Sequence, residues 1–153
     1  RRGTNFVTRK IVEAAVKIKK GKQKKLFLGN LYAKRDWGYA KEYVESMWKI
    51  LNHKIPDDYV VATGKAYSVK TFVEKVFKRL NIDIQWKNKR LKEIGIDKKT
   101  KKVLIKIDPY YFRPQEVNYL KGNNSKAKKI LKWKPKTNLD QLVQIMVEEE
   151  LKK

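Results

Sequence analysis

The chain has 153 residues, of which 41% are hydrophobic, so it is long enough for one domain with an apolar core and too short for two ordinary domains. It contains no cysteine, which excludes disulfide bonds and thiolate metal sites and favours a reducing, cytoplasmic setting. No apolar run approaches the roughly 20 residues that span a bilayer, so a membrane-spanning helix is not expected.

The formal net charge of +23 suggests by itself a polyanionic partner such as nucleic acid. However, the 39 basic residues include only seven arginines, and the lysines are spread through every segment. Base recognition relies on arginine and clustered aromatic residues, so a solvated lysine-rich surface is the simpler interpretation. The opening sequence RRGTNFVTRK lacks an initiator methionine and begins a helix almost at once, from which we expect part of a longer chain.

The first segments alternate between helix and strand patterns. Thr4 or Asn5 can cap a helix that ends at Gly21, because the apolar residues between them recur with a helical period. Residues 25–30, KLFLGN, then predict a short buried strand. A second helix is predicted from Ala40, and it ends before the polar sequence NHKIPDD.

The middle of the chain repeats this alternation. Residues 59–64, YVVATG, predict a strand, and Ser68 is expected to cap a helix whose apolar residues extend to Leu80. Residues 82–86 and 102–108 predict two short strands, and GIDKKTKK between them predicts a turn-rich excursion.

Two helices are expected at the end of the chain, within residues 123–133 and 138–153. The order of elements favours the α/β class. Only the segments 25–30 and 59–64 are predicted as parallel strands in the first half, which is too few for a complete doubly wound sheet. The chain is therefore expected to form part of a larger α/β fold.

No catalytic centre is visible in the sequence. The single histidine, His53, lies at a polar helix end, so no histidine-based triad or metal cluster can form around it. The neighbouring carboxylates Asp57 and Asp58 fit solvated charges or helix caps. Glycine-rich phosphate loops of the GxGxxG or GxxxxGKS type are absent from the sequence.

Charged residues at the ends of elements are the remaining chemical signal. Lys10 lies near the start of the first helix, Arg35 follows the first strand, and Arg113 follows the strand at 102–108. Arginine can bind phosphate oxygens in a bidentate manner, and Glu116 can accept hydrogen bonds from ribose hydroxyls. The pair Arg113 and Glu116 therefore fits a nucleoside diphosphate, and it equally fits a local surface salt bridge.

Six segments carry a resemblance to a known family: RRGTNFVTRKI, LFLGNLYAKRDWGYAKEYVESMW, DDYVVATG, YSVKTFVEKVF, GIDKKTKKVLIKIDPYYFRPQEV and KAKKILKWKPK. Together, and in unbroken order, they closely resemble the C-terminal half of the GDP-mannose 4,6-dehydratases. These enzymes are extended short-chain dehydrogenase/reductases. The resemblance implies the C-terminal, substrate-binding part of an NAD(P)-binding Rossmann-type α/β fold, with a few strands and about five helices.

The resemblance also implies a function and its partners. The intact protein is expected to be an NADP-dependent lyase that converts GDP-mannose to GDP-4-keto-6-deoxymannose, the route to GDP-fucose. Its glycine-rich turn and catalytic residues would lie upstream, so this chain alone is expected to be inactive. Residues 36–64 are expected to pack on the N-terminal Rossmann domain, and the intact enzyme is expected to form a homodimer or homotetramer.

Individual site residues follow from the matched motifs. Arg2 is implied to contact NADP, whereas Val7 and Lys10 are implied to contact the guanosine diphosphate. Arg35 in KRDWGY and Arg113 in YFRP are implied to bind the diphosphate, and Glu116 is implied to accept ribose hydroxyls. The sequence departs from the family at Asn118, where an acidic residue is common, which puts a local hydrogen bond or a helix cap in doubt.

Two alternatives to the dehydratase hypothesis stay open. A non-catalytic nucleotide-sugar-binding module would bind a GDP-sugar without turnover. A basic nucleic-acid-binding domain would bind with an affinity that falls steeply with salt and would be indifferent to GDP.

Overall fold

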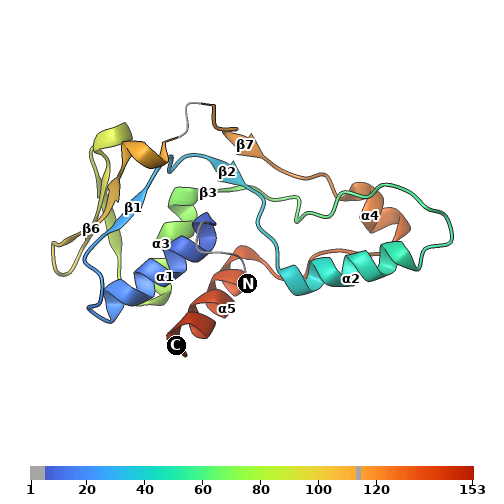
Figure 1. Cartoon of the computed structure of the whole chain (residues 1–153), viewed down its shortest axis with the longest axis horizontal. Helices are drawn as coiled ribbons and strands as arrows, with labels where there is room; N and C mark the ends of the chain where they lie inside the picture. The colour runs from blue at the N-terminus through green and yellow to red at the C-terminus, as the bar shows by residue number, and fades with distance from the viewer. Residues whose placement is uncertain (1–5, 113–114) are drawn as a thin grey trace. The chain divides into compact units, whose positions relative to one another are not determined.

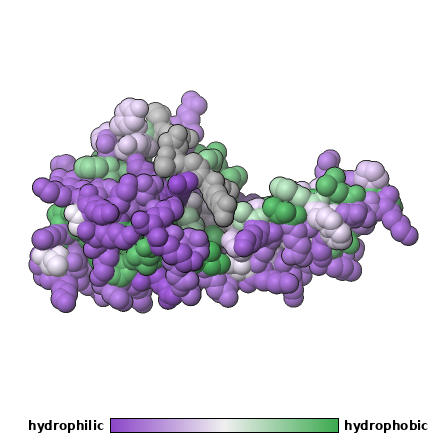
Figure 2. Space-filling view, turned by 60° about the horizontal axis from the view of Figure 1, so that its bottom comes forward, coloured by the Kyte–Doolittle hydropathy of each residue, from purple (hydrophilic) through white to green (hydrophobic). Residues whose placement is uncertain are grey.

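The computed structural model describes residues 6–112 and 115–153, and these residues form two compact units (Figure 1). Among the described residues, the first unit comprises residues 6–33, 68–112, 115–116 and 143–153, and the second comprises residues 34–67 and 117–142. Among the described residues, no helix is long and apolar enough to cross a membrane. Hydrophilic side chains cover most of the face shown in Figure 2, with smaller hydrophobic areas between them, as the lysine-rich composition predicts.

A four-stranded mixed sheet forms the framework of the first unit. Its strands run in the order β1 (Leu26–Leu28), β6 (Val103–Ile107), β5 (Ile94–Asp97) and β4 (Ile84–Lys87). β1 and β6 are parallel, with Leu26 opposite Ile105, and the other two pairings are antiparallel. The predicted strands at 25–30, 82–86 and 102–108 are thus confirmed, with boundaries shifted by one to two residues.

The helices α1 (Val7–Lys19) and α3 (Val69–Arg79) lie side by side in this unit (Figure 1). Their apolar residues recur at helical spacing, and Ile11, Phe72 and Phe77 are fully buried as a result. α3 begins as predicted, because the Ser68 hydroxyl accepts a hydrogen bond from the Thr71 N–H at 3.0 Å. The predicted caps of α1, Thr4 and Asn5, lie outside the described residues.

The second unit contains the helices α2 (Ala40–Leu51) and α4 (Ser125–Ile130), which lie side by side in Figure 1. It also contains a small sheet with the strand order β3 (Tyr67–Ser68), β2 (Lys34–Arg35) and β7 (Tyr119–Leu120). Its core cluster consists of Ala127, Leu131 and Trp133, against which Tyr43 and Ile50 of α2 pack. The Trp133 indole N–H donates to the Glu42 carbonyl oxygen at 3.0 Å. The remaining helix, α5 (Leu139–Leu151), ends the chain as predicted.

The strand predicted at residues 59–64 is wrong: these residues form neither a strand nor a helix. Side chains bind this part of the backbone instead. The Asp36 carboxylate accepts from the N–H groups of Thr63 and Gly64, both at 2.9 Å, and the Asn124 amide donates to the Ala62 carbonyl at 2.8 Å. One of the two parallel strands expected in the first half is therefore absent from this structure.

The turn predicted for GIDKKTKK begins later than expected, because its first residues belong to β5. Asp97 ends the strand, and its carboxylate accepts from the Lys99 N–H at 2.9 Å and the Thr100 hydroxyl at 2.6 Å. Gly95 has low strand propensity, which obscured the strand in the sequence. A Cβ at Gly95 would lie 2.7 Å from Cδ1 of Ile105, so close packing between β5 and β6 requires glycine there.

Candidate functional site

The candidate site of the first unit lies at the carboxyl ends of the parallel strands β1 and β6. Ligands of open α/β sheets bind outside the carboxyl ends of their strands. The segments that follow these strands, residues 29–32 and 108–112, come close together. A Cβ at Gly29 would overlap the carbonyl oxygen of Tyr111, so only glycine permits this approach. The Asp108 N–H also donates to the Leu28 carbonyl at 2.8 Å.

Lys10 brings a positive charge to this edge from α1. Its Nζ lies 3.3 Å from the centroid of the Tyr111 ring, which is a cation–π contact. Burial lowers the pKa of Lys10, and the negative charge of Asp108 opposes that shift. Val7 lies nearly one turn earlier on the same helix and is half-buried. A partly desolvated ammonium group binds an anion more strongly than one in bulk water.

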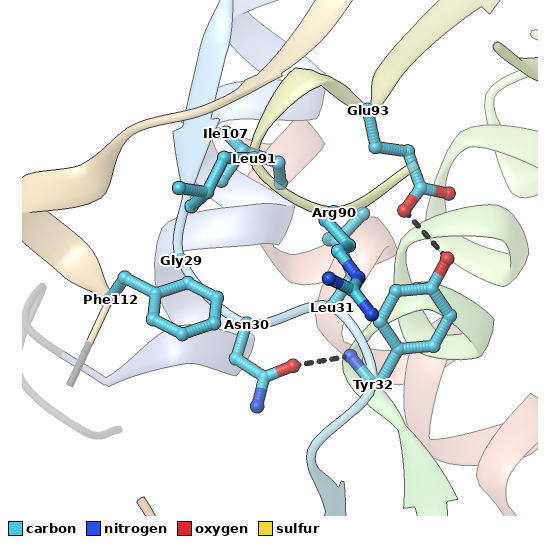
Figure 3. Close-up of a pocket in the computed structure, with 9 residues that line it drawn as sticks. All are labelled: Gly29, Asn30, Leu31, Tyr32, Arg90, Leu91, Glu93, Ile107 and Phe112. Atoms are coloured by element: carbon cyan, nitrogen blue, oxygen red, sulfur yellow. Dashed lines mark hydrogen bonds between the residues drawn. The ribbon is translucent and has the colours of Figure 1, made fainter. Parts of the chain in front are cut away.

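A cavity of about 350 Å³ lies at the same edge (Figure 3). It is lined by residues from the segment after β1, from η1 (Arg90–Lys92) and its following residue, and from the end of β6 and its following segment: Gly29, Asn30, Leu31, Tyr32, Arg90, Leu91, Glu93, Ile107 and Phe112. The volume falls within the range of small-molecule sites. Phe112 directly follows Tyr111, so the cavity and the cation–π contact of Lys10 share one segment.

A buried carboxylate, Glu93, connects three elements behind the cavity. One oxygen lies 2.6 Å from Nζ of Lys70 on α3, and the other accepts from the Tyr32 hydroxyl at 2.6 Å (Figure 3). This hydrogen bond raises the pKa of Tyr32. Burial disfavours the charged form of Lys70, but its hydrogen bond and attraction to Glu93 raise its pKa. No sequence pattern indicated this network, because its three residues are far apart in the chain.

Arg35 belongs to the second unit, on β2. Its Nη1 donates to the carbonyl oxygens of Lys34 at 2.9 Å and Val117 at 2.5 Å. β2 pairs in parallel with β7, and the Lys34 N–H donates to the Asn118 carbonyl at 2.8 Å. Arg35 is thereby held beside the residues that directly follow Glu116 in the chain.

The predicted site residues thus fall into three groups. Val7 and Lys10 lie together in the first unit, which also contains the half-buried Glu116, and Arg35 lies in the second unit. Arg2 and Arg113 lie outside the described residues. The diphosphate and ribose roles assigned from the sequence therefore stay predictions.

In the described part of the chain, no three His, Asp or Glu side chains are grouped so that they could hold a metal ion. The Nδ1 of His53 lies 2.9 Å from the Ile55 carbonyl oxygen, as expected for a histidine at a helix end. Its ring also makes an edge contact with Tyr59.

The family model described as GDP-mannose 4,6 dehydratase matches residues 1–146. Over 151 residues, the chain is 50% identical to a GDP-mannose 4,6 dehydratase of Dictyostelium discoideum. The matched region covers 99% of this chain and 42% of that protein. The chain is also 50% identical to a human protein of the same name, and that match covers 96% of this chain and 40% of the human protein. It is 48% identical to one from Sinorhizobium fredii, and that match covers 98% of this chain and 43% of the bacterial protein. The chain therefore spans less than half the length of these relatives.

Solved structures share the fold at low sequence identity. One is the structure of RMD from Pseudomonas aeruginosa complexed with NADPH, with a TM-score of 0.79, 16% identity, and 99% of this chain and 44% of that chain covered. Another is a dTDP-glucose 4,6-dehydratase from Bacillus anthracis in complex with NAD, with a TM-score of 0.70, 17% identity, and 96% and 39% covered. The predicted α/β class is confirmed, because the described residues combine α-helices with two small sheets and share the fold of these structures.

Proposed function

Since the chain belongs to the GDP-mannose 4,6-dehydratase family, we propose that it is the substrate-binding portion of such an enzyme and binds GDP-mannose. The observation that carries the proposal is the half-buried Lys10 beside a cavity at the carboxyl ends of β1 and β6. A nucleoside diphosphate needs a cation for its phosphates and an enclosed surface for its base, and this edge offers both.

Three residues complete the proposed contacts with the diphosphate and the ribose. Arg35 and Arg113 supply guanidinium groups for the phosphate oxygens, and Glu116 accepts the ribose hydroxyls. Arg35 already donates to two backbone carbonyls, which restricts its side chain before a ligand arrives. Val7, at the first turn of α1, adds an apolar contact to the guanosine.

The proposed reaction is the dehydration of GDP-mannose to GDP-4-keto-6-deoxymannose by a lyase. NADP would supply the hydride chemistry when bound. The chain has no glycine-rich dinucleotide turn, and Arg2, its one proposed contact with NADP, lies outside the described residues. The residues present thus do not form a cofactor site by themselves, and the chain alone is expected to be inactive. A cytoplasmic location stays a prediction.

The proposed docking surface for a cofactor-binding portion lies within residues 36–64. α2 packs Tyr43 and Ile50 on the Trp133 cluster, yet it exposes Val44, Met47, Trp48 and Leu51. A helix that carries apolar residues on a second, adjacent side as well is usually buried on both sides. More than half of each relative's length lies outside this chain, which provides an occupant for the second side. Assembly of the intact enzyme into a homodimer or homotetramer is proposed as well.

Calorimetric titration of the chain with GDP-mannose tests the binding proposal. Saturable binding is expected, with competition by GDP and weaker competition by UDP. Lys10→Met should weaken GDP-mannose binding about tenfold, because it removes a charge-assisted hydrogen bond to phosphate. Lys19→Met changes the net charge equally at an exposed position of the same helix and should leave the affinity unchanged.

Two results would contradict the proposal. Equal losses in the two variants would show that only net charge matters. Binding of an oligonucleotide that weakens steeply with salt, without binding of GDP, would instead favour the basic nucleic-acid-binding alternative.

A further inference from the structure

Glu93 is 2% exposed although its neighbours in the sequence NKRLKEIG are largely charged and solvated. Removing a carboxylate from water is costly unless cations and hydrogen-bond donors replace the lost hydration. Lys70 neutralises one oxygen at 2.6 Å, and the Tyr32 hydroxyl serves the other at 2.6 Å. The burial of Glu93 therefore depends on keeping both partners in place.

Tyr32 itself is held at two points. Its backbone N–H donates to Oδ1 of Asn30 at 2.9 Å, and its hydroxyl donates to Glu93 (Figure 3). Tyr32 is nevertheless 53% exposed and lines the cavity at the end of β1. An exposed tyrosine normally samples several rotamers, but the bond from its hydroxyl to Glu93 restricts the orientation of this ring, and the bond to Asn30 fixes the backbone that carries it. The structure thus presents a fixed aromatic surface to the cavity.

The other lining residues indicate which part of a ligand the cavity suits. Phe112 contributes a second aromatic ring, and Leu91 and Ile107 contribute apolar surface. Lys10, the proposed phosphate contact, does not line the cavity. Its ammonium group lies over the ring of Tyr111, which directly precedes the lining residue Phe112. A planar apolar group next to a phosphate-binding cation corresponds to the base of a nucleotide, because every base has a face that can stack on an aromatic ring.

We propose that Tyr32 packs against the base of the nucleotide ligand and that Glu93 is a positioning residue that orients Tyr32 for this contact. The inference rests on the proposed function and adds two residues to which the matched motifs gave no role. Lys70 supports the same arrangement, since it neutralises Glu93 and its Nζ lies 5.5 Å from the centroid of the Tyr32 ring. Pre-orientation reduces the entropy lost when the base binds.

Titration of the 153-residue chain with GDP, and with inorganic pyrophosphate as a probe without a base, tests this inference. Tyr32→Ala should weaken GDP binding about tenfold, since it removes one base–aromatic contact, and should leave pyrophosphate binding unchanged. Tyr32→Phe keeps the ring and loses the bond to Glu93, so a loss of about threefold is expected. The control Tyr119→Ala removes a ring of similar exposure from the second unit and should change neither affinity.

The role of Glu93 requires a double-mutant cycle. Glu93→Gln should weaken GDP binding in the wild-type background and have no effect in the Tyr32→Ala background, because Glu93 acts through the tyrosine. Equal effects in both backgrounds, or equal losses for GDP and pyrophosphate, would overturn the inference and leave the proposed function standing. Absence of GDP binding by the wild-type chain would overturn the proposed function, and the inference with it. If Tyr32→Ala or Glu93→Gln does not fold, an unchanged affinity in Tyr32→Phe is decisive against it.

Discussion

The two units of the chain treat their apolar side chains differently. In the first unit, the apolar faces of α1 and α3 are buried, and Ile11, Phe72 and Ile105 are inaccessible to water. In the second unit, one side of α2 packs on the Trp133 cluster, whereas Trp48 and Leu51 on the same helix are 65% and 83% exposed. The first unit buries the apolar residues of its helices, whereas the second leaves several apolar residues of α2 exposed to solvent.

The carboxylates of the two units also differ in the groups that they bind. In the first unit, the buried Glu93 is satisfied by two side chains. In the second unit, Asp36 and Glu42 bind backbone N–H groups of segments distant in the sequence, among them those of Gly64 and Thr137. Carboxylate-to-backbone bonds thus hold loops together where regular strand pairing is scarce.

Replacing a core residue of the first unit should have the largest effect on stability. Phe72→Ala is expected to lower the free energy of unfolding by about 4 kcal/mol, because it removes a fully buried ring and leaves a cavity. Urea unfolding followed by circular dichroism measures this change. Tyr110→Ala, at a tyrosine that is 87% exposed in the same unit, should change it by less than about 0.5 kcal/mol. Similar losses in the two variants would mean that Phe72 is not part of a packed core.

Replacing the central residue of the second unit should have a smaller and local effect. Trp133→Ala removes the ring of the core cluster and the hydrogen bond to Glu42, with an expected loss of about 3 kcal/mol. Amide hydrogen exchange should accelerate in α4 and stay unchanged in α3, since the two helices belong to different units. Trp48→Ala serves as the size-matched control on an exposed indole. Equal acceleration in α3 and α4 would show that the units unfold together.

Replacing the exposed tryptophan of α2 should have the smallest effect on the isolated chain. Trp48→Glu is expected to change its free energy of unfolding by less than about 0.5 kcal/mol. The same variant should weaken association with the cofactor-binding portion of the enzyme more than tenfold, because it places a charge in an apolar contact. Sedimentation of the mixed portions measures the association, with Lys41→Glu at an exposed position of the same helix as control. Self-association of the chain that depends on Trp48 would instead identify a second copy as the occupant.

Local sequence patterns predicted most of the regular elements because their causes are local. Helical periodicity identified α1, α2 and α3, and the Ser68 cap located the start of α3. The strand predicted at 59–64 failed because strand formation needs a partner, and here Asp36 and Asn124 bind the backbone instead. β5 was hidden by Gly95, whose role is visible only once Ile105 lies against it.

The sequence by itself determined the family, the α/β class and the candidate phosphate contacts, because these depend on residue types in a fixed order. The contact of Lys10 with Tyr111, the cavity beside it and the bond between Glu93 and Tyr32 were decided only by the tertiary structure. Tyr32 and Glu93 are 61 positions apart, and no local pattern relates them. Folding brings them together because β1 and β5 both lie beside β6 in one sheet.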